Sequence, residues 1–207
     1  EIQGITINGT THKIIQYADD TAMVLKCEES TFRATFILLK KFSCISGLRI
    51  NIEKTKIMRI GAMRDSNTIL VPEYKVEWTN HSINMLGVII ANNRNLLSGL
   101  NYEPKLKKIE NTIAVWKQRK LTVYGKTTII KTFLISQIIY LMSVLPGPSL
   151  EFITRLERTL FQFLWNGKPE RIQRAVLFLP LNQGGIKMPH ISSFNYAIKL
   201  SWLKRVL

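Results

Sequence analysis

Cysteine is scarce in this sequence of 207 residues, which contains only Cys27 and Cys44. Two cysteines cannot build the disulfide framework of a small secreted domain, and their spacing is not that of a structural zinc site. We therefore expect reduced thiols and an intracellular protein, located in the nucleus or the cytoplasm.

Glycine and proline are also few, with 11 and 7 residues, and no short repeat recurs. These absences exclude collagen-like and low-complexity chains. Residues 1–12 lack the apolar stretch of a secretory signal. The longest apolar run, residues 132–145, contains Ser136 and Gln137 and is too short for a bilayer, so it predicts a buried helix and no membrane contact. The sequence starts at Glu1 rather than Met, which indicates a fragment or a processed product.

Acidic residues are in the minority, with 14 Asp and Glu against 29 Lys and Arg, a net charge of +15 and a pI near 10.0. The hydrophobic content of 46% is sufficient for a folded core. Such an excess of positive charge is typical of nucleic-acid binding, because each cation that meets a phosphate releases counterions. A basic surface that serves only solubility is the alternative.

The positive charge gathers in residues 104–131, which contain eight basic residues and one acidic residue. This segment is therefore expected to contact nucleic acid through Lys117, Arg119, Lys120 and Lys126. Tryptophans such as Trp116 could stack on bases. The alternative is packing in the core, where aromatic residues on apolar helical faces are more often found.

The first half of the sequence alternates β-branched and polar residues and predicts strands around one helix. Phe32, Phe36, Leu39 and Phe42 share a helical stripe and are expected in the core. The expected elements are hairpins turning at Asn8-Gly9 and at Ala18-Asp19-Asp20, a helix over 30–46 with Ser30 as N-cap and Gly47 as its stop, a strand over 55–60, and a hairpin made of residues 74–78 and 83–90.

The second half has the apolar spacing of helices. These are expected over residues 103–119, 125–145, 150–165 and 191–206, with a break at 146–148. A domain boundary is placed near residues 91–95, where the pattern changes. The expected fold class is α+β, with antiparallel strands and a packed helix followed by an all-helical region and a short C-terminal helical segment.

The segment that carries chemistry is Tyr17-Ala18-Asp19-Asp20, between two apolar runs. Two adjacent carboxylates repel each other, and a bound divalent cation would offset that cost. Mg²⁺ takes hard oxygen ligands and is held by one or two carboxylates together with substrate phosphates. The alternative is an exposed β-turn, which Asp also favours.

Several motifs in the same order resemble those of the reverse transcriptases of non-LTR, LINE-type retrotransposons. Tyr17-Ala18-Asp19-Asp20 resembles the catalytic Y/F-x-D-D hairpin, and residues 47–56 (GLRINIEKTK) are similar to a G-L-x-x-N-x-x-K-T segment. Met85-Leu86-Gly87-Val88 resembles the F-L-G-V primer-grip turn, with Met in place of Phe, and residues 116–146 resemble the thumb.

The resemblance implies a partial polymerase palm over 1–91, a helical thumb over 92–166 and the start of a connector over 167–207. It implies that Asp19 and Asp20 bind Mg²⁺, with Mn²⁺ as an alternative, and that Tyr17 packs at the primer end or the incoming nucleotide. Lys54 would neutralise or protonate the leaving pyrophosphate, although a solvated lysine fits the position equally well. Leu86 and Gly87 would approach the primer strand. The implied partners are an RNA template, a DNA primer and a deoxynucleoside triphosphate.

The sequence departs from the family in what it lacks. It contains no second catalytic aspartate on an upstream palm strand and no fingers, since its one other aspartate, Asp65, follows the hairpin. We therefore expect the chain to be inactive by itself and to need the remainder of the same polyprotein upstream. The alternative functions are a non-catalytic basic RNA- and DNA-binding remnant of a decayed or host-recruited element, and a purely structural basic protein. Asn51 is expected to fix its loop rather than to touch substrate.

Overall fold

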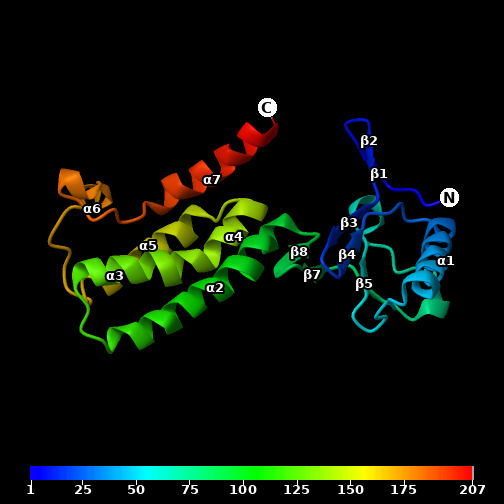
Figure 1. Ribbon diagram of the computed structural model, residues 1–207, viewed down its shortest axis with the longest axis horizontal. Helices are drawn as coiled ribbons and strands as arrows, with labels where there is room; N and C mark the ends of the chain where they lie inside the picture. The colour runs from blue at the N-terminus through cyan, green and yellow to red at the C-terminus, as the bar shows by residue number, and fades with distance from the viewer. Residues whose placement is uncertain (207) are drawn as a thin grey trace. The chain divides into compact units, whose positions relative to one another are not determined.

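The computed structural model describes residues 1–206, and the side chains of residues 1–204. The chain mixes helices and strands, so the α+β class expected from the sequence is confirmed. It divides into two compact units, Glu1–Asn93 (unit 1) and Arg94–Leu207 (unit 2). Unit 1 holds the strands and α1, and unit 2 is helical (Figure 1). The assignment of these parts to palm, thumb and connector stays a prediction.

Unit 1 is built from short strands that form four two-stranded sheets. The antiparallel pairs are β1 (Ile5–Ile7) with β2 (Thr10–His12), β3 (Ile14–Tyr17) with β4 (Asp20–Met23), and β7 (Ser82–Met85) with β8 (Val88–Ala91). The fourth pair, β5 (Lys56–Met58) with β6 (Glu77–Thr79), is parallel, so the expectation of antiparallel strands fails there. Short 3-10 turns lie at η1 (Gly61–Met63) and η2 (Pro72–Tyr74).

Two tight turns decide how these strands pair. Asn8 and Gly9 have φ angles of 48° and 77°, as a type I′ hairpin turn requires, so the predicted β1–β2 hairpin is confirmed. Leu86 and Gly87 have φ angles of 51° and 76° and turn the chain between β7 and β8. The predicted hairpin of residues 74–78 with 83–90 is therefore wrong. The second run folds back on itself at the turn that the F-L-G-V resemblance implies. The apolar periodicity alone does not show it, because leucine rarely adopts positive φ.

The helix α1 (Glu29–Ser46) forms as its apolar spacing predicts and ends at Gly47, whose φ of 75° is left-handed and whose N–H donates to the Ser43 carbonyl. Ser30 is not its N-cap, because the helix begins at Glu29 and its N-cap residue makes no side-chain hydrogen bond. Phe32 and Phe36 pack in a core with Val71 and Val76. Phe42 is 52% exposed, so its assignment to the core is wrong.

A buried polar network holds the loop after β5. The Arg59 side chain is buried and donates to the Oδ1 of Asn80 at 2.9 Å and to the carbonyl of Thr68. Its guanidinium lies over the Trp78 ring at 4.3 Å. Asn92 Nδ2 donates to the carbonyls of Arg59 and Asn80 at 2.6 and 2.8 Å. These contacts join β5, β6 and the end of β8, and the sequence pattern does not predict them.

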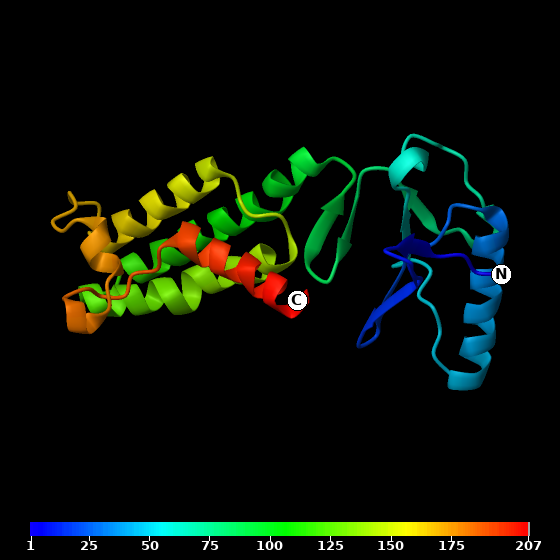
Figure 2. The same ribbon diagram turned by 90° about the horizontal axis from the view of Figure 1, so that it is seen from above.

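Unit 2 consists of helices that run alongside one another (Figures 1 and 2). They are α2 (Arg94–Lys117), α3 (Val123–Ile129), α4 (Ser136–Val144), α5 (Leu150–Leu164), α6 (Arg174–Phe178) and α7 (Ile191–Val206), with a π-helix, η3 (Ile130–Ile135), between α3 and α4 and a 3-10 turn, η4 (Leu181–Gln183), after α6. The α2 helix begins nine residues before the predicted start at 103. Pro104, which suits a first helical turn, lies inside it instead.

The stretch Val123–Val144 is one helix that is long and apolar enough to cross a membrane by length and composition alone. In unit 2, Ile130, Leu134, Ile138 and Met142 are buried at intervals of four residues. This is the pattern of a helix whose apolar stripe packs in a protein core. The absence of membrane contact stays a prediction.

The chain leaves this helix through the Pro146-Gly147-Pro148 break. The Tyr102 hydroxyl of α2 donates to the Pro146 carbonyl at 3.0 Å. The Ser149 hydroxyl then caps α5 by accepting from the Phe152 N–H at 3.2 Å. The last helix packs on α4 and α5, and Trp202 Nε1 donates to the Ser143 carbonyl at 2.9 Å. Trp202 is nevertheless 44% exposed, so it is tied to α4 by this hydrogen bond without being buried in the core.

Candidate acidic hairpin and basic nucleic-acid interface

The acidic pair lies at the tip of the β3–β4 hairpin, as the sequence predicts. Tyr17 pairs with Asp20 across the ladder, so Ala18 and Asp19 form the two-residue turn. Ala18 has a φ of 52°, which costs an alanine roughly 1 kcal/mol. Tyr17, Asp19 and Asp20 are exposed, and the Tyr17 side chain is 69% accessible. A strained turn thus holds two adjacent carboxylates toward solvent.

The chemistry of these carboxylates fits part of a magnesium site. Neither Asp19 nor Asp20 forms an ion pair or a side-chain hydrogen bond among the described residues. Their oxygens are therefore available to coordinate Mg²⁺, which carboxylates and phosphates can bind together. No cluster of three or more His, Cys, Asp or Glu residues occurs in the described part of the chain. The remaining ligands would have to come from substrate phosphates or from other polypeptide.

Lys54 lies in the turn before β5 and is exposed. Its backbone N–H donates to the Oδ1 of Asn51 at 3.1 Å, and the Asn51 carbonyl accepts the Thr55 hydroxyl at 2.7 Å. The expectation that Asn51 fixes its loop is therefore confirmed. No hydrogen bond or ion pair among the described residues joins Lys54 to Asp19 or Asp20.

The Leu86-Gly87 turn is the predicted primer-contacting element. Both residues have positive φ, and the Met85–Val88 pair closes the ladder below them. Leu86 is 38% exposed at the turn. Within unit 1, β7 lies against β5. The turn therefore presents backbone and one aliphatic side chain at the end of a well-supported ribbon.

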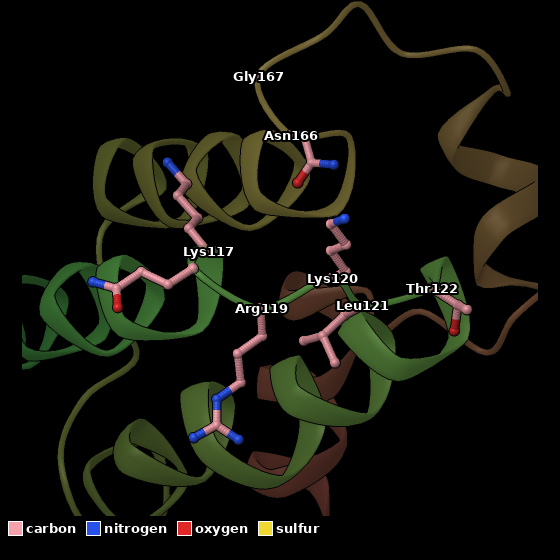
Figure 3. Close-up of a pocket in the computed structure, with 8 residues that line it drawn as sticks. Lys117, Arg119, Lys120, Leu121, Thr122, Asn166 and Gly167 are labelled. Carbon is pink, nitrogen blue, oxygen red and sulfur yellow. The ribbon is translucent and has the colours of Figure 1, made fainter.

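Three of the four predicted basic residues line an open hollow of about 680 Å³ at the junction of α2 and α3. It is lined by Lys117, Gln118, Arg119, Lys120, Leu121, Thr122, Asn166 and Gly167. In Figure 3 the side chains of Lys117 and Lys120 extend toward α5, with Lys120 on the side of Asn166, whereas Arg119 points the other way. The guanidinium of Arg119 lies over the Trp116 ring at 4.9 Å. The lining is cationic, and no carboxylate belongs to it.

Lys126 does not belong to this exposed set, which corrects the expectation that it contacts nucleic acid. It is only 4% exposed, and its ammonium donates to the Leu164 carbonyl at 3.1 Å and to the Asn166 Oδ1 at 2.5 Å. Burial lowers the pKa of Lys126, and the positive charge of Lys117 lowers it further. Lys126 is a structural residue that joins α3 to the end of α5.

Asn166 is not among the residues that the sequence assigns to a binding site. Its φ of 54° and the φ of 72° at Gly167 bring the chain back after α5, and the Gly167 N–H donates to the Gln162 carbonyl at 2.8 Å. This turn places Asn166 between buried Lys126 and the hollow. An Asn-Gly pair after a helical run was the available signal, since both residues tolerate positive φ.

The sequence matches no protein-family model. It is similar to the "Transposon TX1 uncharacterized 149 kDa protein" of Xenopus laevis, with 28% identity over 194 residues. The alignment covers 92% of this chain and 14% of the Xenopus protein, so the chain spans a small part of that relative's length. The chain is thus distantly related to a transposon protein.

Proposed function

We propose that this chain is part of an RNA-directed DNA polymerase of a non-LTR retrotransposon. The observation that carries the proposal is the pair of unpartnered carboxylates at the tip of the strained β3–β4 turn. Because strain of this kind persists where a site needs a particular geometry, Ala18 favours a functional reading of the hairpin over a plain surface turn. Similarity to a transposon protein along most of the chain supports the same reading.

In this proposal Asp19 and Asp20 are the residues that would hold Mg²⁺, or Mn²⁺ in its place. The ion would neutralise charge on the phosphates during nucleotidyl transfer from a deoxynucleoside triphosphate to a primer 3′-hydroxyl. Tyr17, exposed next to the acids, offers an aromatic surface to a base or sugar. Exposed Lys54 would place a cation near the phosphates.

The basic hollow of unit 2 would bind the duplex of template and primer. Lys117 and Lys120 point to the same side, which suits contact with phosphates along one backbone. Arg119 is held against Trp116, where its charge and the ring form a flat surface. The contacts are to phosphate rather than to base edges, so binding would be independent of sequence.

Primer extension by the full-length gene product tests the proposal. With Asp19→Asn, synthesis should fall by at least about 10²-fold, because a carboxylate that neutralises reaction-site charge is lost. Asp65→Asn is the matched control, since Asp65 is exposed and its one ion pair within the described part of the chain is with its neighbour Arg64. Equal synthesis by wild-type and Asp19→Asn protein would show that the hairpin takes no part in the reaction.

A second candidate function is nucleic-acid binding without synthesis. It is favoured by the cationic lining of the hollow, together with the absence of a third acidic ligand near Asp19 and Asp20 within the described residues. Under this reading the full-length product binds primer–template hybrids and incorporates no nucleotide. The primer-extension experiment therefore separates the two candidates.

A further inference from the structure

The outer face of α1 is apolar and exposed. Phe32 and Phe36 point into the core of unit 1, whereas Ile37, Leu38 and Ile45 lie on the opposite side of the helix. Ile45 is 88% exposed, and Ile37 and Leu38 are each more than half exposed. A helix that is apolar on both faces is normally buried on both. The second face of α1 is therefore expected to be covered when the protein works.

This face also contains a hollow with a defined shape. A concavity of about 630 Å³ is lined by Ile37, Lys40, Lys41, Cys44, Ile45 and Tyr74. The α1 members of this set are spaced at i, i+3, i+4, i+7 and i+8, so they form a stripe along the helix. Tyr74 forms the other wall and is stacked on Phe36 at 4.0 Å, which anchors it to the core. The result is an apolar groove with a supported wall.

The charges of the groove are of one sign. Lys40 and Lys41 are exposed, and neither forms an ion pair among the described residues. Arg33, two turns earlier, is by contrast paired with Glu29 at 2.7 Å and with Glu73 at 2.6 Å. An occupant of the groove would therefore bring apolar side chains for its floor and carboxylates for Lys40 and Lys41.

We propose that this groove, the α1 groove, binds an acidic amphipathic α-helix. A second copy of the chain fits poorly, because two faces that each carry Lys40 and Lys41 would repel and the chain has a net charge of +15. A lipid surface would cover a convex helix and would make no use of the hollow beside Tyr74. A helix with an apolar i, i+3, i+4, i+7 stripe fills such a groove directly. The inference concerns unit 1 alone and does not depend on the proposed polymerase function.

The test uses the full 207-residue chain and a fluorescent designed peptide with Leu at i, i+3, i+4 and i+7 and Glu at the remaining positions. Binding is measured by fluorescence anisotropy at about one molar salt, where the Debye length is about 3 Å and non-specific attraction to the basic chain is screened. A peptide of the same composition with a scrambled order controls for net charge. The patterned peptide should bind at least tenfold more tightly than the scrambled one.

Two variants locate the site. Ile45→Asp should weaken binding at least tenfold, and it should leave the fold intact because Ile45 is almost fully exposed. Val115→Asp on α2 is the matched control, since Val115 is also an exposed aliphatic residue on a helix, and it should change nothing. At lower salt, Lys41→Glu should weaken binding of the Glu peptide and strengthen binding of an equivalent Lys peptide.

Several outcomes would overturn the proposal. Equal binding of patterned and scrambled peptides would show that only net charge acts. Equal binding by wild-type and Ile45→Asp protein would place the peptide elsewhere. A concentration-dependent dimer that Ile45→Asp abolishes would make a second copy the occupant. Binding to anionic vesicles that Ile45→Asp abolishes, without binding to the peptide, would make the occupant a lipid surface.

Discussion

At the scale of single residues, the hydrogen bonds decide which charged side chains remain available. Lys117, Lys120 and Lys126 belong to one basic segment and are indistinguishable by charge. The structure distinguishes them. Lys126 is buried and donates hydrogen bonds to the Leu164 carbonyl and Asn166, whereas Lys117 and Lys120 are exposed. A spacing pattern counts cations, but only tertiary contacts show which of them a partner can reach.

Replacing Lys126 with Met should destabilise unit 2. The buried Leu164 carbonyl would lose its ammonium donor, and an unsatisfied buried group costs roughly 1–3 kcal/mol, whereas the amide oxygen of exposed Asn166 can bond to water instead. Lys120→Met is the matched control, because an exposed substitution changes stability by about 0.5 kcal/mol or less. Urea unfolding followed by circular dichroism measures both. Equal unfolding free energies for the two variants would contradict the structural role of Lys126.

At the scale of secondary-structure elements, periodicity predicts α1 and α5 closely, because each has clear apolar spacing and a stop signal after it, Gly47 for α1 and Asn166-Gly167 for α5. The α7 helix also forms over the predicted residues. Periodicity fails where an unusual residue occupies a special position. Leu86 turns the chain at positive φ, and Pro104 lies inside a helix. The parallel pairing of β5 with β6 also cannot be predicted from residue spacing. It is accompanied by long-range contacts of Arg59 and Asn92, which no local pattern indicates.

The burial of Tyr102 predicts a pH dependence of stability. Burial raises the pKa of Tyr102 to about 12, whereas an unfolded tyrosine titrates near 10. Between these values the native state holds the proton that the unfolded chain has lost, so the free energy of unfolding should fall as pH rises. Tyr102→Phe should remove this part of the fall and lower stability at neutral pH by about 1 kcal/mol.

Unfolding in urea at several pH values from neutral to alkaline checks this prediction, with Tyr124→Phe as the control. Tyr124 is exposed, at 63%, and so keeps its ordinary environment on unfolding. A pH profile of Tyr102→Phe that is parallel to the wild-type profile would show that the Tyr102 hydroxyl is not buried as described.

At the scale of the whole molecule, the net charge of +15 means that affinity for nucleic acid should depend on salt concentration as well as on specific contacts. The sequence supplies this charge and the order of the motifs. It does not show that the basic residues surround one hollow, because that depends on the turn at Asn166 and Gly167. The distant relationship to a transposon protein is consistent with both the catalytic and the binding reading.

Removing Lys117 and Lys120 together should reduce the salt dependence of binding. Each phosphate contact contributes about 0.9 to the slope of log affinity against log salt concentration on duplex DNA, so Lys117→Met with Lys120→Met should lower that slope by about 2. The pair Lys40→Met with Lys41→Met in unit 1 is a charge-matched control. Anisotropy titrations of a primer–template hybrid at several salt concentrations measure both. Equal slopes for the two double variants would show that the hollow does not contact nucleic acid.

The central claim is that Asp19 and Asp20 hold a divalent cation beside a primer end. Fe²⁺ substituted for Mg²⁺, with added hydrogen peroxide as the oxidant, tests it in the full-length gene product bound to a primer–template hybrid. Bound Fe²⁺ reduces the peroxide to hydroxide and a hydroxyl radical and is itself oxidised to Fe³⁺, and the radical cuts nucleic acid only close to the metal. We expect cleavage near the primer 3′ end, loss of that cleavage in Asp19→Asn, and its retention in Asp65→Asn. An identical cleavage pattern with and without the Asp19 carboxylate would contradict it.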